Sequence, residues 1–405
     1  MTRALRVLNV IRSIDPAAGG MAEGLRQSVL ATRSMGHVQD VLTLDAPTDP
    51  WVAGFPATVQ ALGPVKGTYG HTPRLVPWLR EHAGRYDAVI VHGLWQYHGL
   101  AVHRALAGGP VPYFVYPHGM LDPWFKRHYP LKHLKKWLYW PWAEYRVLRD
   151  AAAVLFTAEE ERRLAAESFW LYKVRPEVVG YGVTLADASQ LGDASSFTDA
   201  WPETRGKQLV LFLARLHEKK GADLLIDAFA KVAVNAPSLH LVMAGPEGQP
   251  GLLAQLQARA QQAGIAKRIT WTGMLTGQAK WSALKAADVF VLPSHQENFG
   301  VAVVEALALG VPVLLSNKVN IWREVVEGGA GLVADDTADG TTTMLRRWVG
   351  SPQARRDAMR THAIACYAQH FDMATAAHRL VHTVERYHAH AAVPAERAPQ
   401  FTPLK

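Results

Sequence analysis

Two glutamates, Glu297 and Glu305, bracket a segment whose residue types suggest a site for a phosphorylated ligand. The apolar run 289–292 before them is typical of a buried strand, and an Ala-rich helix is expected to begin at Gly300 and to end at Gly310. A helix N-terminus offers free N–H groups and the positive end of the helix dipole, which both favour phosphate. The two carboxylates can accept hydrogen bonds from hydroxyl groups. We therefore expect a ligand with a phosphate flanked by sugar hydroxyls, as in a nucleotide sugar.

Two cations lie upstream in a similar strand-to-helix turn. Arg215 follows the apolar run 209–213, and Lys220 precedes Gly221, where the next helix is expected to begin. Both side chains can reach one site, in which fixed cations would neutralise the charge that grows on a departing diphosphate. The alternative is that both are ordinary solvated charges in a basic loop.

The N-terminal half carries weaker candidates in the loops after its apolar runs. Gly19 and Gly20 lie in the first such loop, where we expect their backbone to bind a phosphate or sugar of the donor, although a simple turn is the alternative. His118 follows the run 113–116 and could bind a hydroxyl or a phosphate oxygen, although a lone histidine in a loop is more often structural. The candidates for contact with an acceptor sugar are His92, Trp95 and Trp124.

The elements that would position these residues form two series of apolar strands alternating with helical stretches, which indicates parallel sheets covered on both faces. We expect an α/β protein with two Rossmann-like, doubly wound domains facing a central cleft. The expected parts are an N-terminal acceptor-binding domain (1–183), an interdomain linker (184–207), a C-terminal donor-binding domain (208–365), a helical segment packing back toward the N-terminal domain (366–390) and a loose tail (391–405).

Composition limits the function classes without choosing among them. The 405 residues, 49% hydrophobic and 19% charged, are typical of a folded protein of two domains, and a net charge of +8 suggests an anionic partner. The single cysteine, Cys366, excludes an internal disulfide and a thiolate metal cluster. We see no signal peptide and no apolar run long enough to span a bilayer, so we expect a cytoplasmic protein, with the cytosolic membrane face as an alternative location.

The combination of Arg215, Lys220-Gly221, Glu297-Asn298-Phe299-Gly300 and Glu305 resembles that of the family 4 (group 1) retaining glycosyltransferases of GT-B fold. Supporting motifs follow in the order expected for that family. They are Gly19-Gly20, Pro117-His118-Gly119, Ala244-Gly245-Pro246, Trp271-Thr272-Gly273 and Arg323-Glu324-Val325-Val326.

The resemblance implies a role for each matching residue. Glu297 would contact the donor sugar, Glu305 would hold the ribose hydroxyls, and Arg215 and Lys220 would bind the diphosphate. His118 would lie beside the transferred sugar. Backbone contacts to sugar and phosphate would come from Phe299, Gly300 and Val301. The chain departs from the family pattern at Ala214, where glycine is common, and in the turn 244–248.

The resemblance also implies a reaction: transfer from a UDP- or GDP-sugar to a glycan or polyprenyl-linked glycolipid, with retention and without a metal or other cofactor. Bacterial exopolysaccharide or lipopolysaccharide biosynthesis is the expected setting. A donor phosphate oxygen can assist deprotonation of the acceptor, so no enzyme nucleophile is required; Glu297 as a covalent nucleophile is the alternative. Other readings are an epimerase or phosphorylase on the same frame, or a basic nucleic-acid-binding protein. The cations lie in loops and one aromatic helix rather than on a reading helix, so we expect no nucleic-acid partner.

The segment 124–142 interleaves basic residues with Trp and Tyr, which suits an anionic membrane surface. The spacing of Leu131, Leu134 and Leu138 favours the alternative, a helix whose leucines pack inward while its lysines are solvated. His378 and His382 lie one helical turn apart, but no carboxylate or cysteine accompanies them at a ligand spacing, so we expect no metal site.

Overall fold

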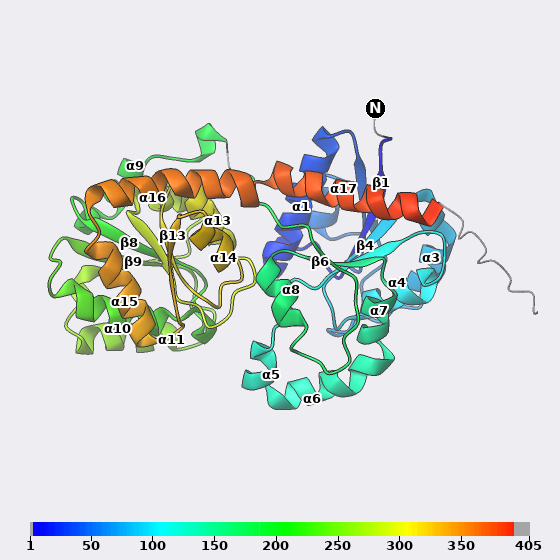
Figure 1. Cartoon of the computed structure of the whole chain (residues 1–405), viewed down its shortest axis with the longest axis horizontal. Helices are drawn as coiled ribbons and strands as arrows, with labels where there is room; N and C mark the ends of the chain where they lie inside the picture. Colours follow the sequence, from blue (N-terminus) through cyan, green and yellow to red (C-terminus); the bar gives the residue numbers. More distant parts are fainter. Residues whose placement is uncertain (1–2, 186, 393–405) are drawn as a thin grey trace, which may run out of the picture. The chain divides into compact units, whose positions relative to one another are not determined.

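The structure is a computed structural model that describes residues 3–185 and 187–392. Its internal contacts divide the chain into two compact units, which we describe separately. Unit 1 comprises Met1–Phe156, Ala166–Val179 and Ala377–Lys405; unit 2 comprises Thr157–Ala165 and Gly180–Ala376. Each unit has one parallel sheet flanked by helices (Figure 1), which confirms the predicted α/β class with two doubly wound domains.

Unit 1 is built on a seven-stranded sheet of order β3-β2-β1-β4-β5-β6-β7. Every neighbouring pair is parallel. The order reverses between β1 and β4, and at such a switch point the loops after the strands diverge and leave room for a ligand. The strands are β1 Arg6–Ile11, β2 Val38–Thr43, β3 Val59–Ala61, β4 Ala88–His92, β5 Tyr113–Tyr116, β6 Ala153–Phe156 and β7 Pro176–Val178.

Helices cover the unit 1 sheet and extend beyond it. Within unit 1, the C-terminal part of α17 packs on the sheet, since Leu380 and Val384 share a core cluster with Leu5, Ile90 and Phe114. The helices are α1 Gly20–Ser34, α2 Pro50–Ala53, α3 Leu75–His82, α4 Tyr97–Leu106, α5 Trp124–His128, α6 Pro130–Tyr139, α7 Glu144–Asp150 and α17 Met373–Ala392.

Unit 2 is built on a six-stranded sheet of order β10-β9-β8-β11-β12-β13, again with parallel neighbours. Its strands are β8 Gln208–Leu213, β9 Leu239–Ala244, β10 Ile269–Gly273, β11 Val289–Leu292, β12 Val313–Ser316 and β13 Gly331–Ala334. Its helices are α8 Glu159–Ala165, α9 Ala194–Ala200, α10 Ala222–Ala233, α11 Leu252–Gln262, α12 Gly277–Ala286, α13 Val301–Ala308, α14 Trp322–Glu327, α15 Ala338–Val349 and α16 Gln353–Cys366.

The unit boundaries differ in detail from those expected. Helix α8 follows β6 of unit 1 but belongs to unit 2, where Glu160 forms an ion pair of 2.9 Å with Arg323 of α14. The segment 184–207, expected to be a linker, contains α9, whose Phe197 is buried in the unit 2 core. A short helix that buries a single aromatic ring has too little apolar periodicity to be recognised in the sequence.

The C-terminal segment expected at 366–390 begins at the end of α16 and continues through α17. Of the tail expected at 391–405, residues 393–405 lie outside the described residues. Among the described residues, we find no helix that is both long and apolar enough to cross a membrane.

Candidate active site

The loops that follow β8 and β11 lie against each other in unit 2. His295 donates its backbone N–H to the carbonyl of Lys219 at 2.8 Å. Gly221 permits this approach, because its φ is +66° and a Cβ there would lie 2.2 Å from the carbonyl oxygen of Pro293. These two strands are also neighbours at the point where the strand order reverses. The fold thus brings the two predicted halves of the site, the cations and the first glutamate, to one edge of one sheet.

Lys220 and Glu297 form an ion pair across these two loops. Their side chains are only 13% and 20% exposed. Burial raises the pKa of Glu297, but the charge and the hydrogen bond of Lys220 outweigh it, so the pKa lies below its ordinary value. Glu297 is therefore a carboxylate at neutral pH and can accept hydrogen bonds.

Helix α13 begins directly after this pair. Gly300 adopts a left-handed conformation with φ +74° and precedes Val301, the first residue of the helix. The N–H groups in the first turn of an α-helix have no partner within the helix and can bind an anion. Phe299 is buried and packs edge-on against Tyr181 and Phe371, so only its backbone can take part in a site. This geometry agrees with backbone roles for Phe299, Gly300 and Val301.

Glu305 lies within α13 and is buried. Lys280 of α12 donates from Nζ to Glu305 Oε1 at 2.6 Å, which fixes the orientation of the carboxylate. Sequence reasoning missed Lys280. Lys280 lies in α12, and helical spacing alone does not reveal which neighbouring element a lysine faces.

Arg215 is exposed, and among the described residues no hydrogen bond or ion pair to its guanidinium is recorded. Its stem packs against the turn after β9, since a Cβ at Gly248 would lie 2.5 Å from Arg215 Cγ and Cδ. Two backbone hydrogen bonds of 2.9 Å join the turn to the arginine loop, from Leu216 to Pro246 and from Gly248 to Leu216. The turn 244–248, which departs from the family pattern, thus packs against the aliphatic part of the Arg215 side chain.

The other departure, Ala214, has a structural explanation. A Cβ at Gly245, whose φ is +142°, would lie 1.9 Å from the carbonyl oxygen of Ala214. Glycine is therefore required at position 245 for this close approach of the two loops. Ala214 itself is partly buried and packs against the unit 2 core.

In unit 1, Gly19 and Gly20 border a cavity of about 400 Å³ at the start of α1. Gly19 has a φ of +92° and precedes the first residue of the helix. Two aromatic rings and one ion pair, formed by Glu23 and Arg26 at 2.7 Å, line the same cavity. The full lining consists of Ile14, Pro16, Gly19, Gly20, Ala22, Glu23, Arg26, Trp51, Gly54 and Phe55. Sequence reasoning missed Trp51 and Phe55, because α2 is too short to show a periodic pattern.

His118 and His92 belong to one hydrogen-bonded chain. His92 Nε2 lies 2.9 Å from Asn9 Oδ1, and His92 Nδ1 lies 3.1 Å from His118 Nε2. The Asn9 amide nitrogen donates to Gln39 at 2.8 Å, so its oxygen accepts from His92, and His92 Nδ1 then accepts from His118. Burial lowers the pKa of His118 to about 4, so this imidazole is neutral at pH 7.

Of the three side chains expected to contact an acceptor, only one is partly exposed. His92 is buried with both ring nitrogens engaged. Trp124 is also buried, and its ring stacks on His128 with centroids 4.1 Å apart. Trp95 is partly exposed, but its ring packs against Trp140 and Phe169. Both His92 and Trp124 are used in packing within unit 1, and their contact with an acceptor stays a prediction.

Two family models together match most of the chain. The model described as "Glycosyl transferases group 1" matches residues 195–363, and that described as "Glycosyl transferase 4-like domain" matches residues 19–182. The chain belongs to the group 1 glycosyltransferases of family 4 type.

Several curated group 1 relatives are similar over part of their length. A mannosylfructose-phosphate synthase of Agrobacterium fabrum is 34% identical over 34% of this chain and 32% of its own. A D-inositol 3-phosphate glycosyltransferase of Jonesia denitrificans is 29% identical over 54% of each chain, and that of Mycolicibacterium smegmatis is 27% identical over 85% of this chain and 71% of its own. The chain thus spans about a third to a half of the first two of these relatives.

Solved structures show the same fold. The Anabaena protein Alr3699/HepE in complex with UDP superposes with a TM-score of 0.75 at 18% identity, covering 94% of this chain and 100% of that one. WaaG, a glycosyltransferase involved in lipopolysaccharide biosynthesis, superposes with a TM-score of 0.61 at 15% identity over 93% and 99%. At these identities the likeness establishes the GT-B fold of this glycosyltransferase family.

Proposed function

We propose that this group 1 glycosyltransferase moves a sugar from a nucleotide-diphosphate donor to a glycan or glycolipid acceptor, with retention and without a metal ion. The observation that carries the proposal is the Lys220–Glu297 pair at the start of α13, with Arg215 on the same strand-end edge of unit 2. The UDP found in Alr3699/HepE supports a nucleotide as the ligand of this edge, and UDP or GDP is the donor base we expect.

The charges of unit 2 suit the departure of a diphosphate. Arg215, Lys220 and the first turn of α13 would offset the negative charge that grows as the bond between the anomeric carbon and the phosphate oxygen breaks. Glu297, held ionised by Lys220, would accept hydrogen bonds from the hydroxyls of the donor sugar. Glu305, oriented by Lys280, would accept hydrogen bonds from the ribose hydroxyls.

The proposed transfer requires no covalent intermediate on the protein. The acceptor hydroxyl would attack the anomeric carbon on the face from which the diphosphate departs, and its proton would pass to a donor phosphate oxygen. This role fits Glu297 better than that of a nucleophile, because its carboxylate is already engaged by Lys220. We assign His118 to contact with the transferred sugar as a neutral imidazole.

We assign the cavity beside Gly19 and Gly20 to the acceptor, although the sequence pointed to these two glycines as donor contacts. The partly exposed rings of Trp51 and Phe55 could stack on a sugar face, and Glu23 and Arg26 could bind its hydroxyls. A glycan or glycolipid acceptor of this kind would place the enzyme in polysaccharide assembly at the cytoplasmic side of a membrane.

A thermal-shift panel of UDP, GDP, ADP and their sugars tests the donor assignment. We expect one base to raise the melting temperature of the wild type and of Lys231→Ala, an exposed cation of α10 that pairs with Asp339, but not that of Lys220→Ala. Anomeric analysis of the product by NMR tests retention, and turnover in chelator tests metal independence. If no nucleotide shifts the wild type, the donor assignment is wrong.

A further inference from the structure

Helix α6 turns its leucines outward, contrary to the packing that their spacing suggested. Leu131, Leu134 and Leu138 are 79%, 55% and 61% exposed, and no residue of α6 is buried. Figure 1 shows α5 and α6 at the edge of unit 1 away from its sheet. The prediction that these leucines enter the core is wrong, because the 3-4 spacing identifies an apolar stripe but not what covers it.

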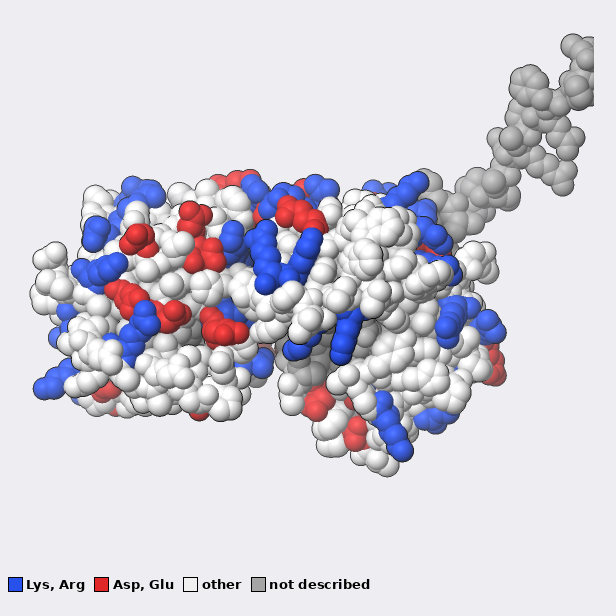
Figure 2. Space-filling view, turned by 90° about the horizontal axis from the view of Figure 1, so that it is seen from below, with Lys and Arg blue, Asp and Glu red and all other residues white. Residues whose placement is uncertain are grey.

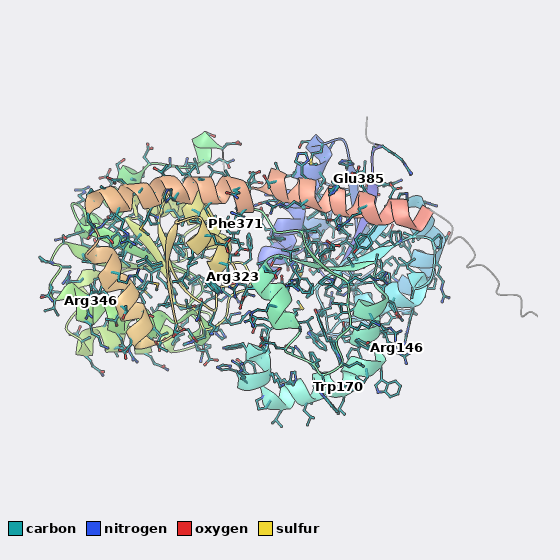
Figure 3. All side chains as sticks on the ribbon, viewed as in Figure 1. Arg146, Trp170, Arg323, Arg346, Phe371 and Glu385 are labelled. Carbon is teal, nitrogen blue, oxygen red and sulfur yellow. The ribbon has the colours of Figure 1, made fainter. Side chains whose placement is uncertain are left out.

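Three tryptophans extend this apolar stripe. Trp137, Trp142 and Trp170 are 42%, 72% and 67% exposed, and the rings of Trp137 and Trp170 lie 6.3 Å apart. Figure 3 shows Trp170 close to α6. Exposed apolar side chains that gather in one place mark an interaction site, whereas single ones do not. We call this set the α6 surface: Leu131, Leu134, Trp137, Leu138, Trp142 and Trp170.

The exposure of the α6 surface does not come from a poorly anchored helix. The opposite side of the helix is held, since Lys136 lies 4.5 Å from the centre of the Trp95 ring and the Tyr139 and Tyr69 hydroxyls lie 2.7 Å apart. Just after the helix, Trp140 is buried, stacks on Phe169 at 4.0 Å and donates to the Leu171 carbonyl at 2.7 Å. Lys136, Tyr139 and Trp140 thus hold the helix on unit 1, and its leucines are exposed on the other side.

The charge around the α6 surface selects the partner. The segment 124–142 contains five lysines and arginines and no aspartate or glutamate. Lys136 holds the opposite side of the helix, and the other four cations are Lys126, Arg127, Lys132 and Lys135. Seen from the side of α5 and α6, unit 1 presents broad white areas with separate blue side chains and a few red ones (Figure 2). A second copy of the chain would bring these cations against each other. An anionic lipid surface complements them.

We propose that the α6 surface lies in the interface of an anionic lipid bilayer. The leucines and tryptophans enter the boundary between headgroups and acyl chains, and the neighbouring lysines and arginines contact lipid phosphates. Leucine and tryptophan on one face of a helix with basic residues beside it is the composition of helices that lie in this interface. The inference does not depend on the transfer reaction, since it concerns only α5, α6 and their neighbours in unit 1.

Vesicle flotation of the full chain tests the proposal. We expect the wild type to float with vesicles of phosphatidylcholine and phosphatidylglycerol, but not with phosphatidylcholine alone, and salt to weaken this binding. The triple variant Leu131→Gln, Leu134→Gln, Leu138→Gln should lose at least about tenfold in lipid affinity, because binding scales with buried apolar area. Lys132→Gln with Lys135→Gln should weaken binding to anionic vesicles only.

The matched control removes three apolar side chains that are exposed elsewhere, in unit 2: Val234→Gln, Met274→Gln and Ile364→Gln. This variant should float like the wild type, and all variants should keep the wild-type melting temperature. Trp fluorescence of the wild type, but not of the leucine variant, should be quenched by brominated lipid. The proposal is overturned if the wild type does not bind anionic vesicles or if the leucine variant binds equally well. Dissociation of a wild-type dimer by the leucine variant, without lipid binding, would assign the surface to self-association instead.

Discussion

The two units have the same kind of parallel sheet but use their polar residues in opposite ways. In unit 2 a strand-end loop holds Glu297, kept charged by Lys220, and the helix α13 that follows holds Glu305, oriented by Lys280. In unit 1, burial keeps His92 at the end of β4 and His118 in the loop after β5 neutral, and cations of α5 and α6 lie near the α6 surface. One unit is thus suited to stabilise charge that develops on a leaving group, and the other to position neutral hydroxyls and to bind a surface.

The largest expected effect concerns the charged edge of unit 2. Lys220→Ala, Glu297→Ala and Arg215→Ala should each reduce turnover by about 10²-fold or more, because each removes a charge aimed at the donor. Lys231→Ala is the control, since it removes an exposed cation of the same unit that pairs with Asp339. Steady-state kinetics measure the effect, and wild-type rates in all three site variants would contradict the assignment.

A second prediction isolates the close approach of the two loops. Gly221→Ala should cost about 3 kcal/mol of unfolding free energy, because it adds both a strained φ and a clash with the Pro293 carbonyl. Gly264→Ala has a similar φ of +69° but open space around the added Cβ, so it should cost only about 1 kcal/mol. Urea denaturation compares them. Equal losses of unfolding free energy in the two variants would mean that the close approach of Gly221 to Pro293 does not contribute to stability.

Acid should weaken unit 1 more than unit 2. Burial lowers the pKa of His98 to about 4, below the value of about 6.5 in an unfolded chain, so the unfolded state binds more protons between these pH values. Stability is therefore lost as pH falls from 6.5 toward 4, by about 2 kcal/mol at pH 5 from this residue alone. Burial also lowers the pKa of His92 and of His118 in unit 1. In unit 2, burial lowers the pKa of His240.

Hydrogen exchange of each unit at pH 7 and pH 5 measures this difference. Protection in the unit 1 sheet should fall further than protection in the unit 2 sheet, and His98→Gln should reduce the pH dependence. Equal losses of protection in both units would refute the contrast.

The smallest effect is expected at Lys280. Lys280→Met should weaken donor binding by about tenfold, because Glu305 keeps its place in α13 but loses the bond that orients it. Calorimetric titration measures the change, with Lys285→Met of the same helix as the control, since Lys285 donates to the Gly192 carbonyl instead. An unchanged affinity in Lys280→Met would mean that Glu305 does not bind the donor.

The sequence predicted the sheets and the charged edge because both depend on local signals. Continuous apolar runs identify buried parallel strands, and residues directly after them must lie at one edge, which is how Lys220 and Glu297 could be assigned to one site; the ion pair between them was not predicted. Packing directions depend on distant residues and could not be predicted in this way. The leucines of α6 lie in a correctly expected helix, but which neighbour they face is decided by the tertiary structure, and the same holds for the partners of Lys280 and Trp124.

Calorimetric titration of UDP and GDP into the wild type, Lys220→Ala and Lys231→Ala tests the central claim most directly. The claim is that the Lys220–Glu297 edge of unit 2 binds the diphosphate of the donor. We predict saturable binding of one nucleotide to the wild type and to Lys231→Ala, and affinity at least about tenfold weaker in Lys220→Ala. Equal affinity in all three proteins, or no binding to any of them, would contradict it.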